Sequence, residues 1–517
     1  MSHLRAPGLG PIVGHTTATT TRLWIRGAAS GDESDRTIGI AAIYQKGQKR
    51  PLKIDYFRLR REFDRTGIID FTDLKPDQIY QAILGTLSIS TVDPDAVMDD
   101  DTLRKLLPAP RMWLSELEAL PVDQARALFR TGRGDTGGPL TFLFGSCRYP
   151  GLFPQQAKLA DRIFAAMVAQ LNQERPPDFC MMVGDQIYAD LFSRFLPIGR
   201  ADSYDEFRER YDSAFSTPNL RRLLQKLPAY MILDDHEIED NWHQGRIRDS
   251  SKRLLFNTAI AAYRSYQWIH SPRNYGNHLY YSFEAQGYPF FVMDSRTQRV
   301  CVPEHPERNH LLGYPAKDSP YPDGGTHPRY PGQLDDLCLW LIETQRDCGD
   351  RPKFIVSPSV FVPNTVHSLQ DAEDDDAWPA FPETRKTLLQ TIVRHNIQNV
   401  VFLCGDVHCS IVASMSFHRG NETLPLKAYS ITSSAFFWPF CFADGDPNSF
   451  VHNSHKERDD FDLGDCVMRY EASIFEQEDN FTRVEVDEKS VTVKILDRNG
   501  SLRGSKAGQN YSARLEL

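Results

Sequence analysis

Short apolar runs end abruptly in clusters of charged or metal-binding residue types at six places in the sequence. Continuous apolar runs of this length are typical of strands that are buried on both faces, as in a sheet covered by helices. In open α/β sheets, ligands bind beyond the carboxyl ends of the strands. We therefore expect an α/β fold in which these clusters converge on one active site. The runs are residues 141–145, 179–183, 230–233, 289–293, 353–356 and 399–404, and the clusters begin at Ser146, Gly184, Asp234, Asp294, Ser357 and Gly405.

The chain has 517 residues, of which 41% are hydrophobic, so it can bury a large core and is expected to form two domains. Its net charge of -10 argues against nonspecific nucleic-acid binding through a basic face. The sequence has no apolar stretch of about 18 residues and no signal-peptide pattern, which predicts a cytoplasmic protein without a membrane partner. Its nine cysteines are widely spaced, as expected for reduced, buried thiols. The oligomeric state stays open.

Patterning divides the chain into three parts. Residues 1–94 alternate polar and apolar positions in strand-like segments and predict a small β-sandwich. Residues 95–138 predict a helical connector, with a helix expected over 123–129. Residues 139–517 alternate strands with helical periodicity and predict the catalytic domain. Helices are expected at 158–171, 206–224, 251–269, 334–343 and 385–395. Long irregular segments at 301–333, 364–382 and 435–463 are either functional loops or surface decoration.

The polar clusters contain the side chains that metal ions bind in proteins. Asp406 and His408 are two residues apart, which places both side chains on one face of extended backbone. Cys147, Tyr188 or His408 taken alone could be an ordinary core residue, and their occurrence together at strand ends is what favours a metal site. Carboxylate, imidazole, amide and thiolate groups could form a dinuclear centre there. The candidates are Cys147, Asp185, Tyr188, Asp235, His236, Asn241, Asp406 and His408.

Two adjacent metal ions can activate a water and neutralise the oxygens of a phosphoryl group during in-line displacement. Phosphate esters need such help because their uncatalysed hydrolysis is among the slowest of biological reactions. Arg148, Arg296 and Arg299 could bind the phosphoryl oxygens through bidentate hydrogen bonds, or they could pair with the many nearby acids. The sequence thus favours a phosphoric ester hydrolase.

The combined motifs resemble those of the PhoD-type alkaline phosphatases (the alkaline phosphatase D family), within the calcineurin-like metallophosphoesterases. The resemblance extends from a β-sandwich-like segment near the amino terminus, through the Trp378 loop, to the motif that ends at His408, and so spans nearly the whole chain. The motifs that carry it are Ser146-Cys147, Gly184-Asp185-x-x-Tyr188, Asp234-Asp235-His236-Glu237-x-x-x-Asn241, Asp294-Ser295-Arg296, residues 376–385 and Gly405-Asp406-Val407-His408.

The resemblance implies a four-layer α/β/β/α catalytic domain that holds a ferric ion and calcium. It implies that Asp185 bridges the ions, while the assignment of the other ligands to either ion stays open. His236 would be a general acid or would support the ligands, and Asp235 would orient it or a ligand. Substrate contact by Arg296 and Arg148 is expected from the residues themselves, and Arg148 departs from the family pattern because relatives often have a polar amide there. The implied metal ligands are Cys147, Asp185, Tyr188, Asn241, Asp406 and His408.

The resulting hypothesis is metal-dependent hydrolysis of a small phosphate monoester or diester by a metal-activated water. One alternative uses the same site in a phosphodiesterase or nuclease-like hydrolase. Another, from a different class, is a noncatalytic binding protein whose metal site is structural. The complete set of ligand residues argues against that second alternative, because a site that had lost its function would have lost some of them.

Overall fold

The computed structural model describes most of the chain, including all six predicted apolar runs. Residues 314–331, 365–375 and 441–449, which make up much of the three expected irregular segments, lie outside the described residues. No helix among the described residues is long and apolar enough to cross a membrane. The described residues are 3–28, 35–90, 98–134, 137–151, 154–190, 199–273, 278–302, 305, 308–313, 332–364, 376–440, 450–503 and 511–517.

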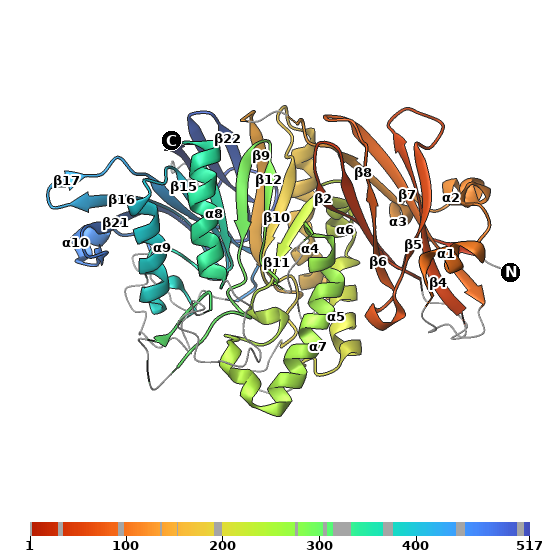
Figure 1. The fold of residues 1–517 in the computed structure, drawn as a ribbon, viewed down its shortest axis with the longest axis horizontal. Coiled ribbons are helices and arrows are strands. Elements are labelled where there is room, and N and C mark those ends of the chain that lie inside the picture. Colours follow the sequence, from red (N-terminus) through yellow and green to blue (C-terminus); the bar gives the residue numbers. More distant parts are fainter. Residues whose placement is uncertain are drawn as a thin grey trace.

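The amino-terminal part is a β-sandwich, as predicted (Figure 1). One of its sheets has the strand order β1-β7-β4-β5, with β8 beside β7, and the other has the order β2-β3-β6. Buried side chains from both sheets, including Leu23, Ile43 and Phe57, pack together as one core. The strands are β1 (Leu4–Arg5), β2 (Leu9–Thr16), β3 (Thr21–Arg26), β4 (Asp35–Gln45), β5 (Lys53–Arg58), β6 (Thr66–Phe71), β7 (Ile79–Ser90) and β8 (Arg126–Arg130).

The helix expected over residues 123–129 is wrong for most of its length. Short helices do follow the sandwich, namely α1 (Asp100–Lys105), η2 (Pro110–Trp113), α2 (Leu114–Glu118) and α3 (Val122–Ala125). From Arg126 onward, however, the chain forms β8 and pairs antiparallel with β7. Ala127 and Phe129 are buried while Leu128 is exposed, which is the alternation of a strand that covers one face of a core. Pairing with β7 therefore outweighs the local helical tendency.

The remaining strands form two large sheets, and all six apolar runs form or overlap strands within them. In the first sheet β9, β10 and β11 are parallel neighbours, and in the second β13, β14 and β15 are parallel neighbours. The first sheet contains β9 (Leu140–Arg148), β10 (Phe179–Val183), β11 (Ala229–Ile232), β19 (Ser434–Phe437), β22 (Asn480–Asp487), β23 (Ser490–Asp497) and β24 (Ser512–Glu516). The second contains β12 (Tyr281–Ala285), β13 (Tyr288–Val292), β14 (Lys353–Ser357), β15 (Val400–Cys404), β16 (Ser410–Arg419), β17 (Glu422–Thr423), β18 (Ala428–Thr432), β20 (Phe461–Asp462) and β21 (Val467–Glu476).

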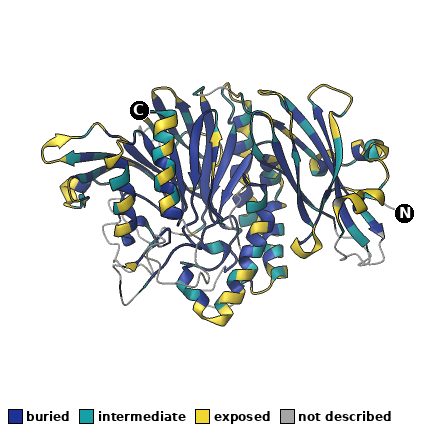
Figure 2. Ribbon diagram, in the orientation of Figure 1, coloured by how far each residue is buried: buried dark blue, intermediate teal, exposed yellow. Residues whose placement is uncertain are grey.

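Helices cover the outer faces of both sheets, which gives the four α/β/β/α layers (Figures 1 and 2). The first sheet packs on α4 (Pro154–Ala169), α5 (Tyr204–Phe215), α6 (Pro218–Leu224) and α7 (Ser250–Tyr266). The second packs on α8 (Gln333–Cys348) and α9 (Pro382–Arg394). Short elements complete the described part: η1 (Arg61–Phe63), η3 (Gln170–Asn172), η4 (Asp235–Glu237), η5 (Gln244–Arg248), η6 (Trp268–His270), η9 (Trp378–Ala380) and α10 (Ser454–Glu457).

Helix α7 joins the sandwich to the first large sheet. The indole Nε1 of Trp24 in β3 donates a hydrogen bond to the carbonyl of Ser265 at 2.9 Å. The hydroxyl of Tyr266 donates a hydrogen bond to the carboxylate of Asp64, also in the sandwich. The side chains of Trp24, Tyr266 and Asp64 are all buried, and so is the hydrogen bond to the Ser265 carbonyl. The sandwich is therefore packed against the part of the chain that forms the two large sheets, through directional bonds as well as apolar contact.

The core between the two large sheets is rich in phenylalanine. The ring of Phe142 in β9 stacks on Phe179 with 5.1 Å between ring centroids. Its edge contacts reach Phe290 at 5.7 Å and Phe354 at 5.6 Å in the opposite sheet. Rings that touch in edge-to-face geometry stabilise one another beyond the effect of area burial alone. These contacts fix how the carboxyl ends of the two sheets face each other.

We predict that Phe142→Ala destabilises the part of the protein that forms the two large sheets by about 3–5 kcal/mol, because it removes a ring from a fully buried core. The measurement is urea-induced unfolding followed by intrinsic fluorescence. Leu339→Ala on α8 is the matched control, since Leu339 is exposed and its truncation leaves no internal cavity. Equal unfolding midpoints for the two variants would contradict the assigned sheet packing.

Candidate metal centre

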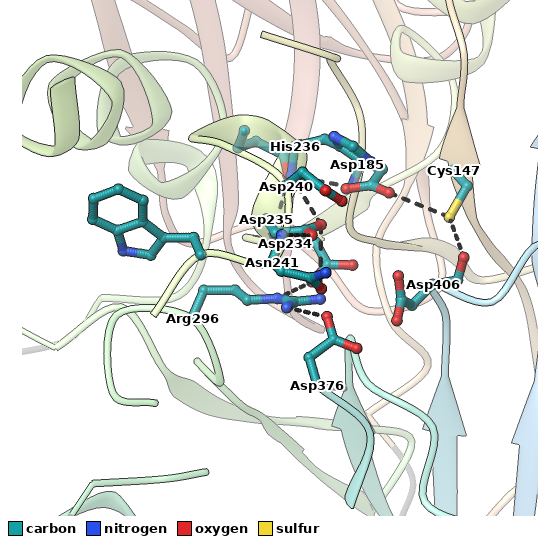
Figure 3. Close-up of polar contacts among 12 residues, drawn as sticks. Cys147, Asp185, Asp234, Asp235, His236, Asp240, Asn241, Arg296, Asp376 and Asp406 are labelled. Carbon is teal, nitrogen blue, oxygen red and sulfur yellow. Dashed lines mark hydrogen bonds and ion pairs between the residues drawn. The ribbon is translucent and has the colours of Figure 1, made fainter. Parts of the chain in front are cut away.

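The predicted metal-binding side chains come together where the carboxyl ends of the two sheets meet (Figure 3). Cys147 lies at the end of β9, Asp185 follows β10, and the loop from Asp234 to Asn241 follows β11. Asp406 and His408 follow β15 in the other sheet. The sequence pattern predicted one convergent site, and the structure forms it from two sheets that face each other.

Three overlapping groups of side chains among the described residues have ligand atoms within 4.8 Å of one another. Asp185 belongs to all three groups, which is the position required of a bridging carboxylate. The groups are Cys147, Asp185 and His408; Asp185, Asp235 and His236; and Asp185, Asp234, Asp235 and Asp406.

Hydrogen bonds connect the ligand atoms around Asp185. The Cys147 thiol lies 3.4 Å from Asp185 Oδ2 and 3.2 Å from the Asp406 carbonyl oxygen. The Tyr188 hydroxyl also lies 3.4 Å from Asp185 Oδ2. The thiol of Cys147, the phenol of Tyr188 and the carboxylate of Asp185 therefore lie close together, as expected if all three bind metal. Asn241 lies in the same group of side chains (Figure 3).

The backbone at this site is held in an unusual conformation. A positive φ is uncommon for residues other than glycine and costs of order 1–3 kcal/mol each when the surroundings impose it. Such residues cluster at functional sites because the surrounding structure must hold them there. Five of the six predicted metal ligands have a positive φ: Cys147 at 56°, Asp185 at 55°, Asn241 at 55°, Asp406 at 74° and His408 at 55°.

Two glycines allow the loops to approach closely. A Cβ on Gly184 would lie 2.4 Å from the Cβ of Asp234, and Gly184 itself has φ +89°. A Cβ on Gly405 would lie 2.5 Å from the Val183 carbonyl oxygen. Any side chain at either position would push the aspartate loops apart. The glycine before each of Asp185 and Asp406 is therefore a packing requirement of the site.

Glu237 ties the loop after β10 to the loop after β11. Its buried carboxylate accepts hydrogen bonds from the backbone N–H groups of Gln186 at 2.7 Å, Asp234 at 3.0 Å and Asp185 at 3.2 Å. It also accepts one from Nε2 of Gln267, at 3.1 Å, just beyond α7. We call this set of four hydrogen bonds the Glu237 clamp. The clamp orients the aspartates without taking one of their ligand atoms.

Arg296 supplies positive charge beneath the aspartates. Its Nε donates to Asp234 Oδ1 at 2.5 Å, Nη1 donates to Asp376, and Nη2 lies 3.7 Å from Asp235 Oδ1. The guanidinium is completely buried and engaged with three carboxylates. This arrangement orients Asp234 and Asp235 and lowers the electrostatic repulsion among the buried acids.

The donor set has the properties of a metal site. Asp185 Oδ1, Asp234 Oδ2 and His408 Nε2 are buried and have no hydrogen-bond partner among the described residues. Burial and neighbouring acids raise the pKa values of Asp185 and Asp406 well above the usual range, so both carboxylates need nearby positive charge to stay ionised. Cations placed among these atoms would satisfy both requirements. The residues present therefore fit metal ions.

His236 is held by a carboxylate that the sequence interpretation did not include. Its Nδ1–H donates to Asp190 Oδ1 at 2.8 Å, and Asp190 Oδ2 accepts a hydrogen bond from the Asp240 backbone at 2.7 Å. Burial alone would lower the pKa of His236, but the carboxylates of Asp190, Asp235 and Asp185 raise it well above its usual value. Asp190 lies two residues after Tyr188, and only the folded loop shows that it faces the imidazole.

The three predicted arginines differ in their surroundings. The guanidinium of Arg148 is buried and donates to the Ala214 carbonyl at 2.8 Å and the Thr217 hydroxyl at 3.0 Å, where α5 ends. Those bonds favour a structural role over the substrate contact expected of it. Arg299 lies beside the site, with Nη1 3.3 Å from the Asn241 carbonyl oxygen. Arg296 is the one of the three that, among the described residues, forms ion pairs with carboxylates of the metal groups, namely Asp234 and Asp235.

Comparisons with known proteins identify the family and the fold of this chain. A family model described as PhoD-like phosphatase matches residues 153–443. The solved structure of PhoD is 14% identical, with a TM-score of 0.64 over 99% of this chain and 89% of that chain, and so shares its fold. The anchor in the inner membrane complex of Plasmodium is 11% identical, covers 74% of this chain and 89% of its own, and has a TM-score of only 0.38. No curated protein matches by sequence.

The family match spans the helices and strands from α4 to β19, and thus the loops that carry Asp185, Asp235, His236, Asp406 and His408. Members of this family are metal-dependent phosphoric ester hydrolases, and the buried acidic and histidine groups described above suit that chemistry. The chain belongs to the PhoD-like phosphatase family.

Proposed function

We propose that this protein hydrolyses small phosphate monoesters or diesters at a dinuclear centre of Fe³⁺ and Ca²⁺. The observation that carries the proposal is the convergence of ligand atoms on Asp185. Thiol, imidazole and carboxylate atoms lie within 4.8 Å of one another in three groups that share Asp185, and the Tyr188 hydroxyl lies 3.4 Å from Asp185 Oδ2. Thiolate and phenolate ligands suit a strongly Lewis-acidic transition metal, and carboxylate and amide oxygens suit calcium.

The residues proposed to hold the ions are those predicted from the sequence: Cys147, Asp185, Tyr188, Asn241, Asp406 and His408. Asp185 would be shared between the two ions, because it alone belongs to every candidate group. Bound there, the ions would lower the pKa of a water and neutralise phosphoryl oxygens. Asp235 is also within reach of this volume, and its hydrogen bond from the Asn241 backbone at 2.6 Å orients the loop that carries the amide.

His236 is the proposed general acid. A ring nitrogen of His236 lies within 4.8 Å of carboxylate oxygens of Asp185 and Asp235, so the imidazole borders the space proposed for the ester. Asp190 fixes the ring through Nδ1, which leaves Nε2 to give a proton to the departing oxygen. Arg296 keeps Asp234 and Asp235 in place throughout, because its contacts with both are buried.

Asp185→Asn is expected to lower kcat/KM for p-nitrophenyl phosphate and bis-p-nitrophenyl phosphate by about a thousandfold or more, because the loss of a shared ligand removes several kcal/mol of transition-state stabilisation. The ratio of the two wild-type activities separates a monoesterase from a diesterase. Asp202→Asn is the control, since Asp202 has a largely exposed carboxylate. An Asp185→Asn enzyme with wild-type turnover would refute the proposed centre.

Glu237→Gln is expected to weaken metal retention about 10–100-fold, the usual effect of losing a group that orients metal ligands. The amide presents N–H groups to backbone N–H donors and so breaks part of the Glu237 clamp. Iron and calcium content is measured by elemental analysis after graded dialysis against chelator. Glu383→Gln on the exposed start of α9 serves as the control, and identical metal loss in both variants would rule out the clamp.

Asp190→Asn tests the role of His236. A poor leaving group needs protonation more than a good one, and general acid catalysis contributes about 10²–10⁴-fold. We therefore expect kcat to fall at least about tenfold more for an alkyl phosphate than for p-nitrophenyl phosphate. The measurement is kcat over a series of esters with graded leaving-group pKa. An equal loss for every ester would mean that Asp190 only supports the fold.

A further inference from the structure

An aromatic cluster borders the metal centre on the side of His408. It consists of Tyr149, Tyr188, Trp438 and Phe440, and we call it the aromatic wall. The indole of Trp438 stacks on the His408 ring, with 3.7 Å between centroids and 12° between planes. Trp438 also approaches Tyr188 at 6.1 Å. The wall therefore includes one proposed metal ligand, Tyr188, and contacts a second, His408.

The wall is built on ordered backbone. Strand β19 pairs with β9, and the backbone N–H of Tyr149 donates to the Phe437 carbonyl at 3.1 Å. The backbone N–H of Trp438 donates to Asp479 Oδ1 at 3.2 Å. These bonds fix the chain on both sides of the Trp438 ring. The position of the wall relative to His408 is thus set by the same sheet that carries Cys147.

The outer part of the wall is open to solvent. Phe440 is 47% exposed, although its ring contacts Trp438 at 5.0 Å and Tyr149 at 5.1 Å, both edge-on. Tyr149 is buried and supports the other two rings from below, with Trp438 at 5.6 Å. An exposed ring that is held by one buried ring and one partly buried ring, and that leads to a metal ligand, forms a platform next to the proposed reacting centre.

Charge and shape indicate what this platform would bind. The centre itself is lined by acids and Arg296, whereas the wall is uncharged aromatic surface: one face of Trp438 stacks on His408, and the exposed part of the wall is the ring of Phe440. Aromatic groups pack on such surfaces in stacked or edge-to-face geometry and gain more than their buried area alone provides. The wall carries no charged side chain, so it offers no direct ion pair to a second phosphate.

We propose that the aromatic wall is a subsite for the alcohol portion of the substrate, and that it selects phosphate esters whose alcohol carries an aromatic ring. This inference rests on the proposed phosphate ester hydrolysis and adds the substrate class to it. The ring lies against Trp438 and Phe440 while the phosphoryl group occupies the metal centre. Phe440 is then a specificity-determining residue, since its ring contacts among the described residues are with Tyr149 and Trp438, and neither of these is a proposed metal ligand.

The test is the ratio of kcat/KM for 1-naphthyl phosphate to that for glycerol phosphate, measured on the full-length, metal-loaded enzyme. Comparing this ratio between variants cancels the intrinsic reactivity of the two esters. Phe440→Ala is expected to lower the ratio about tenfold, the scale of losing one aromatic pair with its buried area. Phe440→Trp is expected to keep the ratio, because it retains a π-face. Phe63→Ala, which truncates an exposed phenylalanine in the sandwich, is expected to leave it unchanged.

A ratio in Phe440→Ala equal to that of the wild type would overturn the subsite while leaving the proposed hydrolysis intact. A wild-type enzyme that hydrolyses neither ester would overturn both proposals. Light scattering after size-exclusion chromatography gives a second readout. If Phe440→Ala converts an oligomer to a monomer, Phe440 packs against a second copy of the chain, and the subsite is likewise overturned.

Discussion

Mutual repulsion among buried carboxylates is the constraint on which the rest of the site depends. Asp185, Asp234, Asp235 and Asp406 offer oxygens within 4.8 Å of one another, and all but the last are deeply buried. Like charges this close in a low-dielectric interior are strongly unfavourable unless cations accompany them. Arg296 provides one positive charge, and the unpartnered ligand atoms leave room for more. The surrounding fold therefore holds these four carboxylates close together against their electrostatic repulsion.

The two large sheets hold the carboxylates in place in two ways, through the packing of one sheet on the other and through the backbone conformation at the strand ends. The phenylalanine core fixes the two parallel strand edges opposite each other, and the strand ends deliver the ligands in left-handed backbone conformations. Each such residue is costly in isolation, so surrounding contacts must over-determine it. The Glu237 clamp and the close approach at Gly184 provide those contacts. Contacts that hold polar groups in place in this way are what preorganised electrostatic catalysis requires.

Apolar runs alone were enough to predict the six strands and their convergence, because burial on both faces leaves a strong local pattern. Their division into two sheets came only from the family resemblance, since strand pairing is not encoded in any one run. Residues 126–129 were mistaken for helix because their tertiary partner β7 is more than thirty residues away in the chain. Asp190 and Glu237 escaped functional assignment because their roles consist of hydrogen bonds to distant loops.

Helix α7 connects the amino-terminal sandwich to the loops of the candidate metal centre. Tyr266, bonded to Asp64 of the sandwich, stacks on Tyr211 with 4.6 Å between ring centroids. The Tyr211 hydroxyl accepts a hydrogen bond from Gln267 Nε2 at 3.1 Å, and the same nitrogen donates to Glu237. An unbroken series of contacts therefore runs from one domain to the backbone of Asp185. The sandwich therefore supports the position of the metal-binding loops. Truncating or recombining this enzyme at the boundary between the sandwich and the large sheets would remove that support.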